Sequence, residues 1–209
     1  MTSIITNGLS SAMRAISNGA RYPVIVLLLL AALLTLGELA GLAAEYFSDH
    51  RHLKAELPRL VDQLHAAENP SACIRESGLL RTQKKLLLEL LKHPDLPENS
   101  LTALGEALLE EQEDRYAATV RRSDLVARIA PMLGLLGTLI PLGPGIISLG
   151  QGDTYTLSLS LLTAFDTTVL GLISAAVALV ISSVRRKWYK RYMDQLRALA
   201  ECVLEEMTK

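Results

Sequence analysis

Residues 130–184 of the chain read APMLGLLGTLIPLGPGIISLGQGDTYTLSLSLLTAFDTTVLGLISAAVALVISSV. Two apolar segments, each long enough to cross the roughly 30 Å hydrocarbon core of a bilayer, are joined there by a short polar turn at 151–155. The polar residues inside the segments are mostly small hydroxyls, plus one carboxylate, Asp166. Because each polar group costs free energy inside a membrane, this pattern indicates a function beyond anchoring.

A third apolar segment at 24–44 precedes this pair and is also long enough to span a membrane. It is too long for a cleavable signal peptide, so we expect a retained helix. With a mean hydropathy of +0.28, the composition agrees with an integral membrane protein. The predicted transmembrane helices are 23–46, 124–150 and 157–184.

The polar, charged region at 47–123 is predicted to be helical and to face water. Apolar residues recur at helical spacing over 53–67 and 79–91, and the prolines at 94 and 97 break the second of these helices. No strand pattern of any weight is present. The predicted fold class is therefore all-α.

Two of the membrane helices are predicted to extend far beyond the bilayer. Ser100 is a candidate N-cap, and no helix breaker follows it until Pro131, so this helix is expected to continue into the second membrane segment. Apolar residues also recur at helical spacing over 185–209, which predicts that the third membrane helix continues to the C-terminus.

Basic residues cluster at three places and are missing from the turn. The clusters lie at 51–59, 115–128 and 185–191, whereas the turn carries only Asp153. Positive charge favours the cytoplasmic side, and this outweighs Arg14 and Arg21 near the N-terminus. The predicted organisation in the cytoplasmic (inner) membrane is an external segment at 1–22, a cytoplasmic region at 47–123, an external turn at 151–156 and a cytoplasmic C-terminal helix at 185–209.

Enzymatic and metal chemistry are not indicated. Cys73 and Cys202 lie far apart, and no histidine stands at metal-ligand spacing from either, so no metal site and no cofactor are expected. The membrane segments lack the Ser/His, paired Asp or His/Glu sets that intramembrane catalysis requires. A formal net charge of −1 gives no reason to expect a nucleic-acid partner.

Small and polar residues form one stripe on each helix of the hairpin. One interpretation is close helix packing, with hydroxyls bonded to carbonyls of their own helix. The other is a narrow polar lumen in which threonines hold water or pass protons, and the two are compatible. Pro141 and Pro144 indicate either a loosened helix near the outer surface or a flared outer mouth. The stripes comprise Gly134, Thr138, Pro141, Gly145 and Ser148 in one helix and Ser160, Ala164, Thr167, Thr168, Gly171, Ser174, Ala175 and Ala178 in the other. Gly137 and Gly143 add surface for close approach of the helices.

Two carboxylates lie inside membrane segments. Asp166 is a candidate proton site, and the alternative is an interface lock in which it bonds a neighbouring hydroxyl. Glu38 is close to the cytoplasmic end of the first segment, where we expect it to extend to the interface or to pair with a base.

The strings Ala130-Pro131-Met132-Leu133-Gly134-Leu135-Leu136-Gly137-Thr138 and Ala164-Phe165-Asp166-Thr167-Thr168-Val169-Leu170-Gly171-Leu172 resemble the MotA/TolQ/ExbB proton-channel family. That family has a G-L-x-G-T run in one helix and a T-x-x-G-L run in the next. The resemblance covers residues 121–190. The three-span layout with an external N-terminus and a long cytoplasmic loop is similar to the TolQ/ExbB branch.

The resemblance implies a homopentamer around a dimer of a single-span partner of the ExbD/TolR/MotB kind, whose membrane aspartate takes up and releases protons. The chain would be the channel-forming stator subunit of a motor driven by the proton motive force, doing work in the cell envelope. Thr138 and Thr168 match the family's pore threonines, and Thr167 is adjacent. The alternative is a helical membrane scaffold that recruits a cytoplasmic partner without ion conduction.

Thr163 marks a departure from the family pattern. It occupies the position of the glutamate that TolQ and ExbB carry five residues before the third-span threonine, and here the acid is at Asp166. The predicted proton pathway comprises Thr138, Thr163, Asp166, Thr167 and Thr168. The predicted helix-packing residues are Gly134, Gly137, Pro141 and Gly171.

Overall fold

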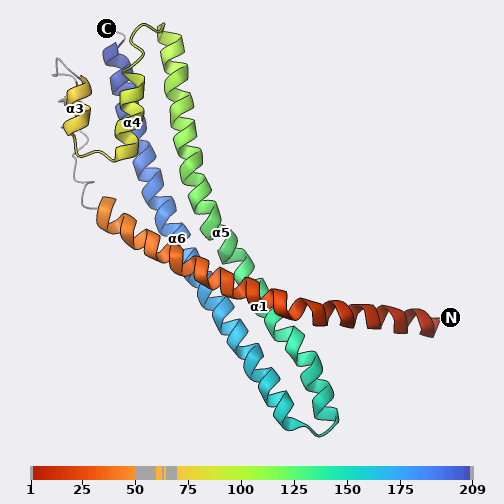
Figure 1. The fold of residues 1–209 in the computed structure, drawn as a ribbon. Helices are drawn as coiled ribbons and strands as arrows, with labels where there is room; N and C mark the ends of the chain where they lie inside the picture. The colour runs from red at the N-terminus through yellow and green to blue at the C-terminus, as the bar shows by residue number, and fades with distance from the viewer. Residues whose placement is uncertain (1, 50–59, 63, 65–69, 208–209) are drawn as a thin grey trace. The chain divides into compact units, whose positions relative to one another are not determined.

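The computed structural model describes residues 2–49, 60–62, 64 and 70–207, all of them in helices, turns or short connections (Figure 1). No strand occurs in this part of the chain, which confirms the predicted all-α class. The predicted helix at 53–67 lies largely outside the described residues. The helices are α1 (Thr2–Asp49), α3 (Pro70–Glu76), α4 (Arg81–Leu90), α5 (Glu98–Gly150) and α6 (Thr154–Met207).

Three helices are long and apolar enough to cross a membrane: α1 between Gly19 and Phe47, α5 and α6. As predicted, α5 and α6 continue well beyond their apolar segments, with 53 and 54 residues respectively. The prediction of Ser100 as an N-cap is wrong. The carbonyl of Pro97 already accepts hydrogen bonds from the Ser100 and Leu101 amides, at 2.9 Å each, so α5 begins at Glu98 and Ser100 lies in its first turn.

The chain divides into two compact units, which we describe separately. The hairpin unit comprises Met1–Leu39 and Arg122–Ser182, and therefore holds the apolar parts of α5 and α6. The polar unit comprises Ala40–Arg121 and Ser183–Lys209.

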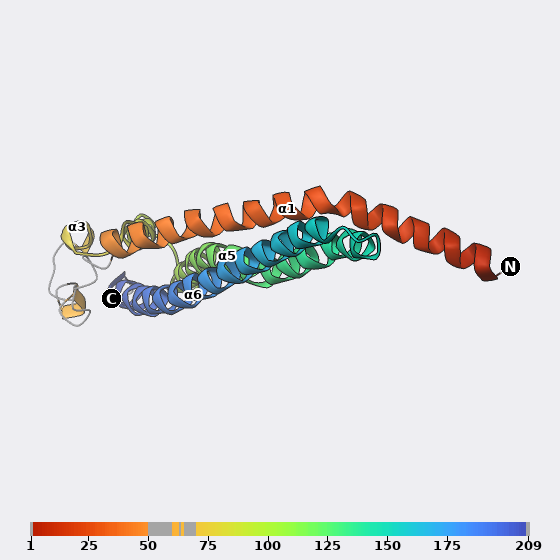
Figure 2. The same cartoon turned by 90° about the horizontal axis from the view of Figure 1, so that it is seen from below.

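In the hairpin unit, α1 crosses one side of the α5–α6 hairpin (Figures 1 and 2). Val24 and Leu28 of α1 are buried against Leu133 and Ile140 of α5, and Leu170 of α6 packs against the same cluster. This contact leaves the opposite side of the hairpin without a covering helix in the hairpin unit.

The turn that closes the hairpin depends on two residues. Gly152 has φ = 81°, a left-handed conformation that residues with a Cβ adopt only at a cost. Asp153 then caps α6, because its side chain accepts hydrogen bonds from the amide and the hydroxyl of Thr156. Both hydrogen bonds lower the pKa of the Asp153 carboxyl below its ordinary value.

The polar unit has its own apolar core. Leucines from α4 pack against α6, and Gln83 of α4, which is almost fully buried, donates a hydrogen bond to the Tyr192 carbonyl of α6 at 3.2 Å. Because that carbonyl is far from Gln83 in sequence, this bond attaches α4 at one position along α6. The core includes Ile74, Leu86, Leu87, Leu90, Leu196, Leu199 and Val203.

Stacked aromatic rings join helices of the polar unit. Tyr116 of α5 stacks on Tyr189 of α6 with ring centroids 4.4 Å apart. Tyr46, near the end of α1, stacks on Trp188 of α6 at 6.1 Å with 26° between the ring planes. Offset stacking of this kind stabilises beyond the area buried, so α1 and α5 are both fastened to α6 here.

Candidate functional site

The hairpin helices approach most closely at three glycines. A Cβ atom at Gly171 would lie 2.7 Å from the Ala130 carbonyl oxygen and 3.0 Å from the Cα of Gly134. A Cβ at Gly137 would lie 2.6 Å from the Cβ of Thr167. At Gly134 and Gly171 the close neighbours are backbone atoms, so the two backbones approach directly, as they do where small residues mediate membrane helix packing. At Gly137 the close neighbour is the Thr167 side chain.

Thr167 lies inside this contact. Its side chain is packed against Gly137 and is only 8% exposed. Its hydroxyl donates to the Thr163 and Ala164 carbonyls of its own helix, at 3.1 Å and 2.9 Å. In the single chain, Thr167 is therefore part of the packing between α5 and α6.

Thr138 and Thr168 lie on the side of the hairpin opposite α1. At about 100° per residue, Thr138 is about 140° to 160° around α5 from the α1-contacting Leu133 and Ile140. Thr168 is about 160° around α6 from Leu170, by the same count. We call this side of the hairpin the open face.

Both threonines of the open face are partly exposed. Both also lie close to the glycine contact: Thr138 follows Gly137 in the sequence, and a Cβ at Gly134 would stand 3.5 Å from the Thr168 Cα. Their hydroxyls donate to helix carbonyls: Thr138 to Leu135 at 2.7 Å and Thr168 to Ala164 at 3.1 Å. A hydroxyl that donates in this way keeps its oxygen free to accept a hydrogen bond from outside the helix.

Thr163 and Asp166 are directed elsewhere. Thr163 lines a small crevice with Arg21 of α1, Gly137 and Pro141, which places it on the α1 side. Asp166 is exposed on the hairpin surface, about 160° around α6 from Thr168. The five residues predicted for the proton pathway therefore do not share one face.

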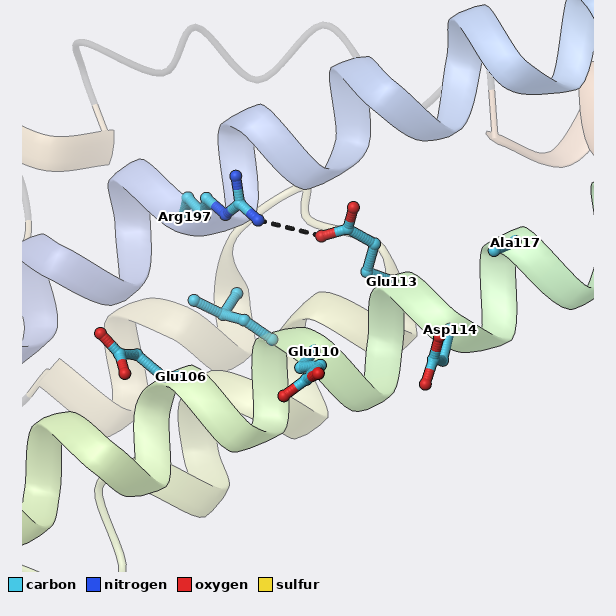
Figure 3. A pocket seen from close by; sticks show the side chains of 7 residues that line it. Glu106, Glu110, Glu113, Asp114, Ala117 and Arg197 are labelled. Atoms are coloured by element: carbon cyan, nitrogen blue, oxygen red, sulfur yellow. Dashed lines mark hydrogen bonds and ion pairs between the residues drawn. The ribbon is translucent and has the colours of Figure 1, made fainter.

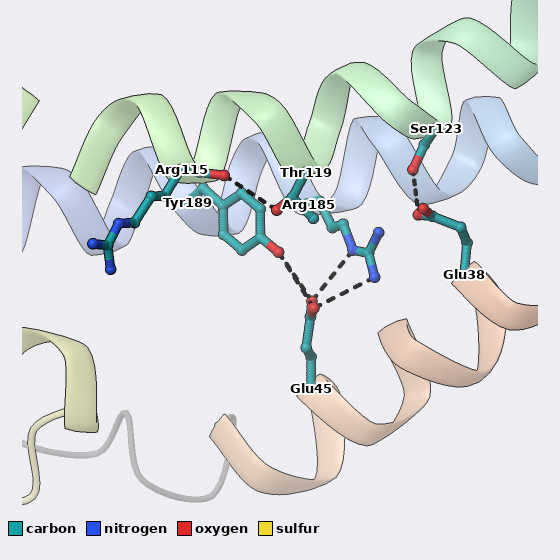
Figure 4. Close-up of polar contacts among 7 residues, drawn as sticks. All are labelled: Glu38, Glu45, Arg115, Thr119, Ser123, Arg185 and Tyr189. Carbon is teal, nitrogen blue, oxygen red and sulfur yellow. Dashed lines mark hydrogen bonds and ion pairs between the residues drawn. The ribbon is translucent and has the colours of Figure 1, made fainter. Parts of the chain in front are cut away.

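Glu38 has a partner that the sequence did not indicate. The Ser123 hydroxyl, which is almost fully buried, donates to its carboxylate at 2.6 Å, as Figure 4 shows. We expected Glu38 to extend to the interface or to pair with a base. No local pattern marks a contact between residues 85 positions apart in the chain.

In the polar unit, Glu45 lies between two residues of α6 (Figure 4). Its carboxylate accepts hydrogen bonds from Arg185 at 3.3 Å and 3.4 Å and from the Tyr189 hydroxyl at 3.3 Å. The Arg185 side chain is only 5% exposed, so this carboxylate compensates a buried charge. Burial, and secondly the charge of Glu45, raise the pKa of Tyr189 well above its ordinary value of 10.0.

An acidic groove also lies in the polar unit. It is lined by carboxylates of α5, one of which, Glu113, pairs with Arg197 of α6 at 2.9 Å (Figure 3). The carboxylates that line the groove are Glu106, Glu110, Glu113 and Asp114. Among the described residues, no three His, Cys, Asp or Glu side chains are arranged to hold a metal ion.

These features define a class: a multi-pass helical membrane protein in which a glycine-packed hairpin presents two threonines on the face away from its first helix. The model of the MotA/TolQ/ExbB proton channel family matches residues 75–198, which is 124 of the 209 residues. The chain therefore belongs to the MotA/TolQ/ExbB proton channel family, as its motifs predicted. A comparison with curated proteins gives no match.

Proposed function

We propose that the protein is the channel-forming stator subunit of a motor complex driven by the proton motive force. In this proposal, identical copies form a ring, five in number, and a dimer of a single-span partner occupies its centre. The partner's membrane aspartate carries protons past the ring, and the resulting motion does work in the cell envelope. The N-terminus and the 151–156 turn face outward from the cytoplasmic membrane, and 47–123 and 185–209 lie in the cytoplasm.

The open face supports this proposal. Because α1 covers the other side of the hairpin, the open face is the side that a ring of copies can turn toward its centre. It carries Thr138 and Thr168, which coincide with the family's pore threonines. Each hydroxyl donates to its own helix, so each can accept a hydrogen bond from a water molecule or from a protonated carboxyl group.

Thr138→Val combined with Thr168→Val tests the proposal. Valine keeps the shape of threonine and removes the hydroxyl, so the ring should assemble while proton flux falls. We expect at least a tenfold loss of flux in proteoliposomes that contain the protein and its partner, with the mass of a pentamer retained in detergent. Flux is measured with an entrapped pH-sensitive dye under an imposed proton gradient.

Thr119→Val is the matched control. The Thr119 hydroxyl makes the same kind of bond, to the Arg115 carbonyl at 3.2 Å, but lies in the polar unit. Thr119→Val should leave the proton flux unchanged. Full flux in the double variant would overturn the pore assignment. Absence of flux in the wild-type complex under both proton and sodium gradients would favour the scaffold alternative instead.

A further inference from the structure

Asp166 is an exposed carboxylate within the predicted membrane segment 157–184 of α6. It lies nine residues beyond Leu157, about 13 Å along the helix at 1.5 Å per residue. Its side chain makes no hydrogen bond or ion pair with the described part of the chain. Because ionisable groups inside a bilayer pair with one another or with other polar groups, Asp166 requires a partner at its own depth.

The side of α6 that carries Asp166 is the side that faces α1. Thr163 of α6 lines a crevice with Arg21 of α1, and Leu170 of α6 packs against the cluster that α1 forms with α5. Asp166 lies between Thr163 and Leu170 along the helix, about 60° around it from the first and about 40° from the second. The nearest helix of the same chain that can supply a partner is therefore α1.

Arg21 is the base that α1 presents on this side. It is exposed, and it has no ion pair among the residues that the structure describes. Gly137 lines the same crevice and contacts Thr167, the residue after Asp166, so Arg21 and Asp166 lie at similar depth. Helical side chains lean toward the N-terminus of their helix, which displaces the Asp166 carboxylate toward the turn of α6 that borders this crevice.

Charge and depth select these two residues as partners within the hairpin unit. Every other charged residue of the unit is seven or more residues along the chain from Arg21, Gly137 and Asp166, which is about 10 Å or more in a helix. The others are Arg14, Arg122 and Arg128 among the bases and Glu38, Asp124 and Asp153 among the acids.

We propose that Arg21 and Asp166 of the same chain form an ion pair in the membrane. Both side chains are exposed, so neither has to displace a packed neighbour to change its rotamer and reach the other. The pair fastens the outer part of α1 to α6 and holds the Asp166 carboxylate on the side of the hairpin away from the open face. Because both partners belong to one chain, the pair depends neither on a ring of copies nor on ion conduction.

Crosslinking within one chain tests the pair. The native thiols are first removed as Cys73→Ala and Cys202→Ala, and Arg21→Cys is then combined with Asp166→Cys. Membranes are treated with a short bifunctional thiol reagent, because the Cα atoms of an Arg–Asp pair are too far apart for a disulfide. The band of single-chain mass from a denaturing gel is cleaved with cyanogen bromide after Met132, which lies between the two positions. We expect the fragments on either side of Met132 to stay joined in at least half of this protein.

Phe165→Cys in place of Asp166→Cys is the matched control. Phe165 is exposed at the same depth of α6 but lies about 140° around the helix from Leu170, on the side away from α1. Its yield of joined fragments should be at least tenfold lower. Equal yields from the two positions would overturn the proposal. So would a link that forms only between differently tagged copies, one with Arg21→Cys and the other with Asp166→Cys.

Charge reversal gives a second measurement. In lipid nanodiscs, Arg21→Glu and Asp166→Arg should each lower the thermal unfolding midpoint, and their combination should recover at least half of the loss. The neutral variants Arg21→Gln and Asp166→Asn give the same comparison where a reversed charge prevents folding. If Arg21 instead binds the phosphate of a lipid, the change at Asp166 gives no recovery, and that result would overturn the ion pair.

Discussion

Gly171 and Gly134 lie so close together that a Cβ atom on the first would stand 3.0 Å from the Cα of the second. The Ala130 carbonyl oxygen, at 2.7 Å from the same point, closes the remaining space. These contacts involve backbone atoms, which cannot move aside as a flexible side chain can. The separation of α5 and α6 is therefore set by the absence of side chains at these positions.

Gly171→Ala should destabilise the hairpin, because the helices must separate to admit one methyl group. Overpacking of this kind typically costs about 1–3 kcal/mol. Gly143→Ala is the control, since a Cβ there meets nothing within 4 Å and alanine favours the helix. Thermal unfolding in detergent should show a lower midpoint for Gly171→Ala alone, and equal midpoints would contradict the close approach.

Glu45→Ala should destabilise the polar unit by leaving Arg185 buried without its carboxylate. The free energy of unfolding should fall by somewhat less than the roughly 3–5 kcal/mol typical of a broken buried ion pair, because the Glu45 side chain is 32% exposed. Glu113→Ala removes the exposed pair with Arg197 and should cost less than about 1 kcal/mol. The measurement is the thermal unfolding midpoint of each variant, compared with that of the wild type. A larger fall in the midpoint for Glu113→Ala than for Glu45→Ala would contradict this ranking.

The start of α6 should depend on acidity through Asp153. Because its pKa is lowered in the folded chain, its stabilising contribution is present above the ordinary value and is lost as the pH falls through the lowered one. The protection of the Thr156 amide against hydrogen exchange, taken relative to its intrinsic exchange rate at each pH, should therefore fall at acid pH. Asp153→Asn keeps an acceptor and should remove the acid dependence of this protection, whereas Asp153→Ala should leave the Thr156 amide poorly protected at every pH.

Tyr189 should remain protonated far into the alkaline range. Its raised pKa means that folding favours the neutral phenol, so this contribution to stability is complete below pH 10 and declines as the pH rises above it. The difference in tyrosinate absorbance between the wild type and Tyr189→Phe should appear only well above pH 10. A difference that developed at or below pH 10 would contradict the buried contact with Glu45.

The long helices could be predicted because helix continuation is a local property. No breaker separates Leu101 from Pro131, and α5 indeed runs through both. The start of α5 was misplaced, since an N-cap serine and a serine in the first turn look alike in sequence. Only the hydrogen bonds to the Pro97 carbonyl distinguish them.

The polar stripes could also be predicted, but not the direction in which each member points. Thr167 and Thr168 are adjacent, about 100° apart on the helix, and periodicity assigns both to one broad stripe. The contact of Thr167 with Gly137 of α5 marks the buried threonine, and the contacts of α1 with Leu133 and Leu170 show which side of the hairpin stays open. The bond between Ser123 and Glu38 was beyond prediction for the same reason, because it depends on how α1 crosses α5.

Trp188 is the only tryptophan in the chain, and its indole stacks on Tyr46 of α1. With excitation at a wavelength that tyrosine does not absorb, the emission of the unlabelled protein therefore comes from one known position. Any event that lifts the end of α1 from α6 would change the surroundings of that single fluorophore. Tryptophan fluorescence is therefore an intrinsic probe of the contact between α1 and α6, and it can be measured in a detergent micelle or a vesicle without an added dye.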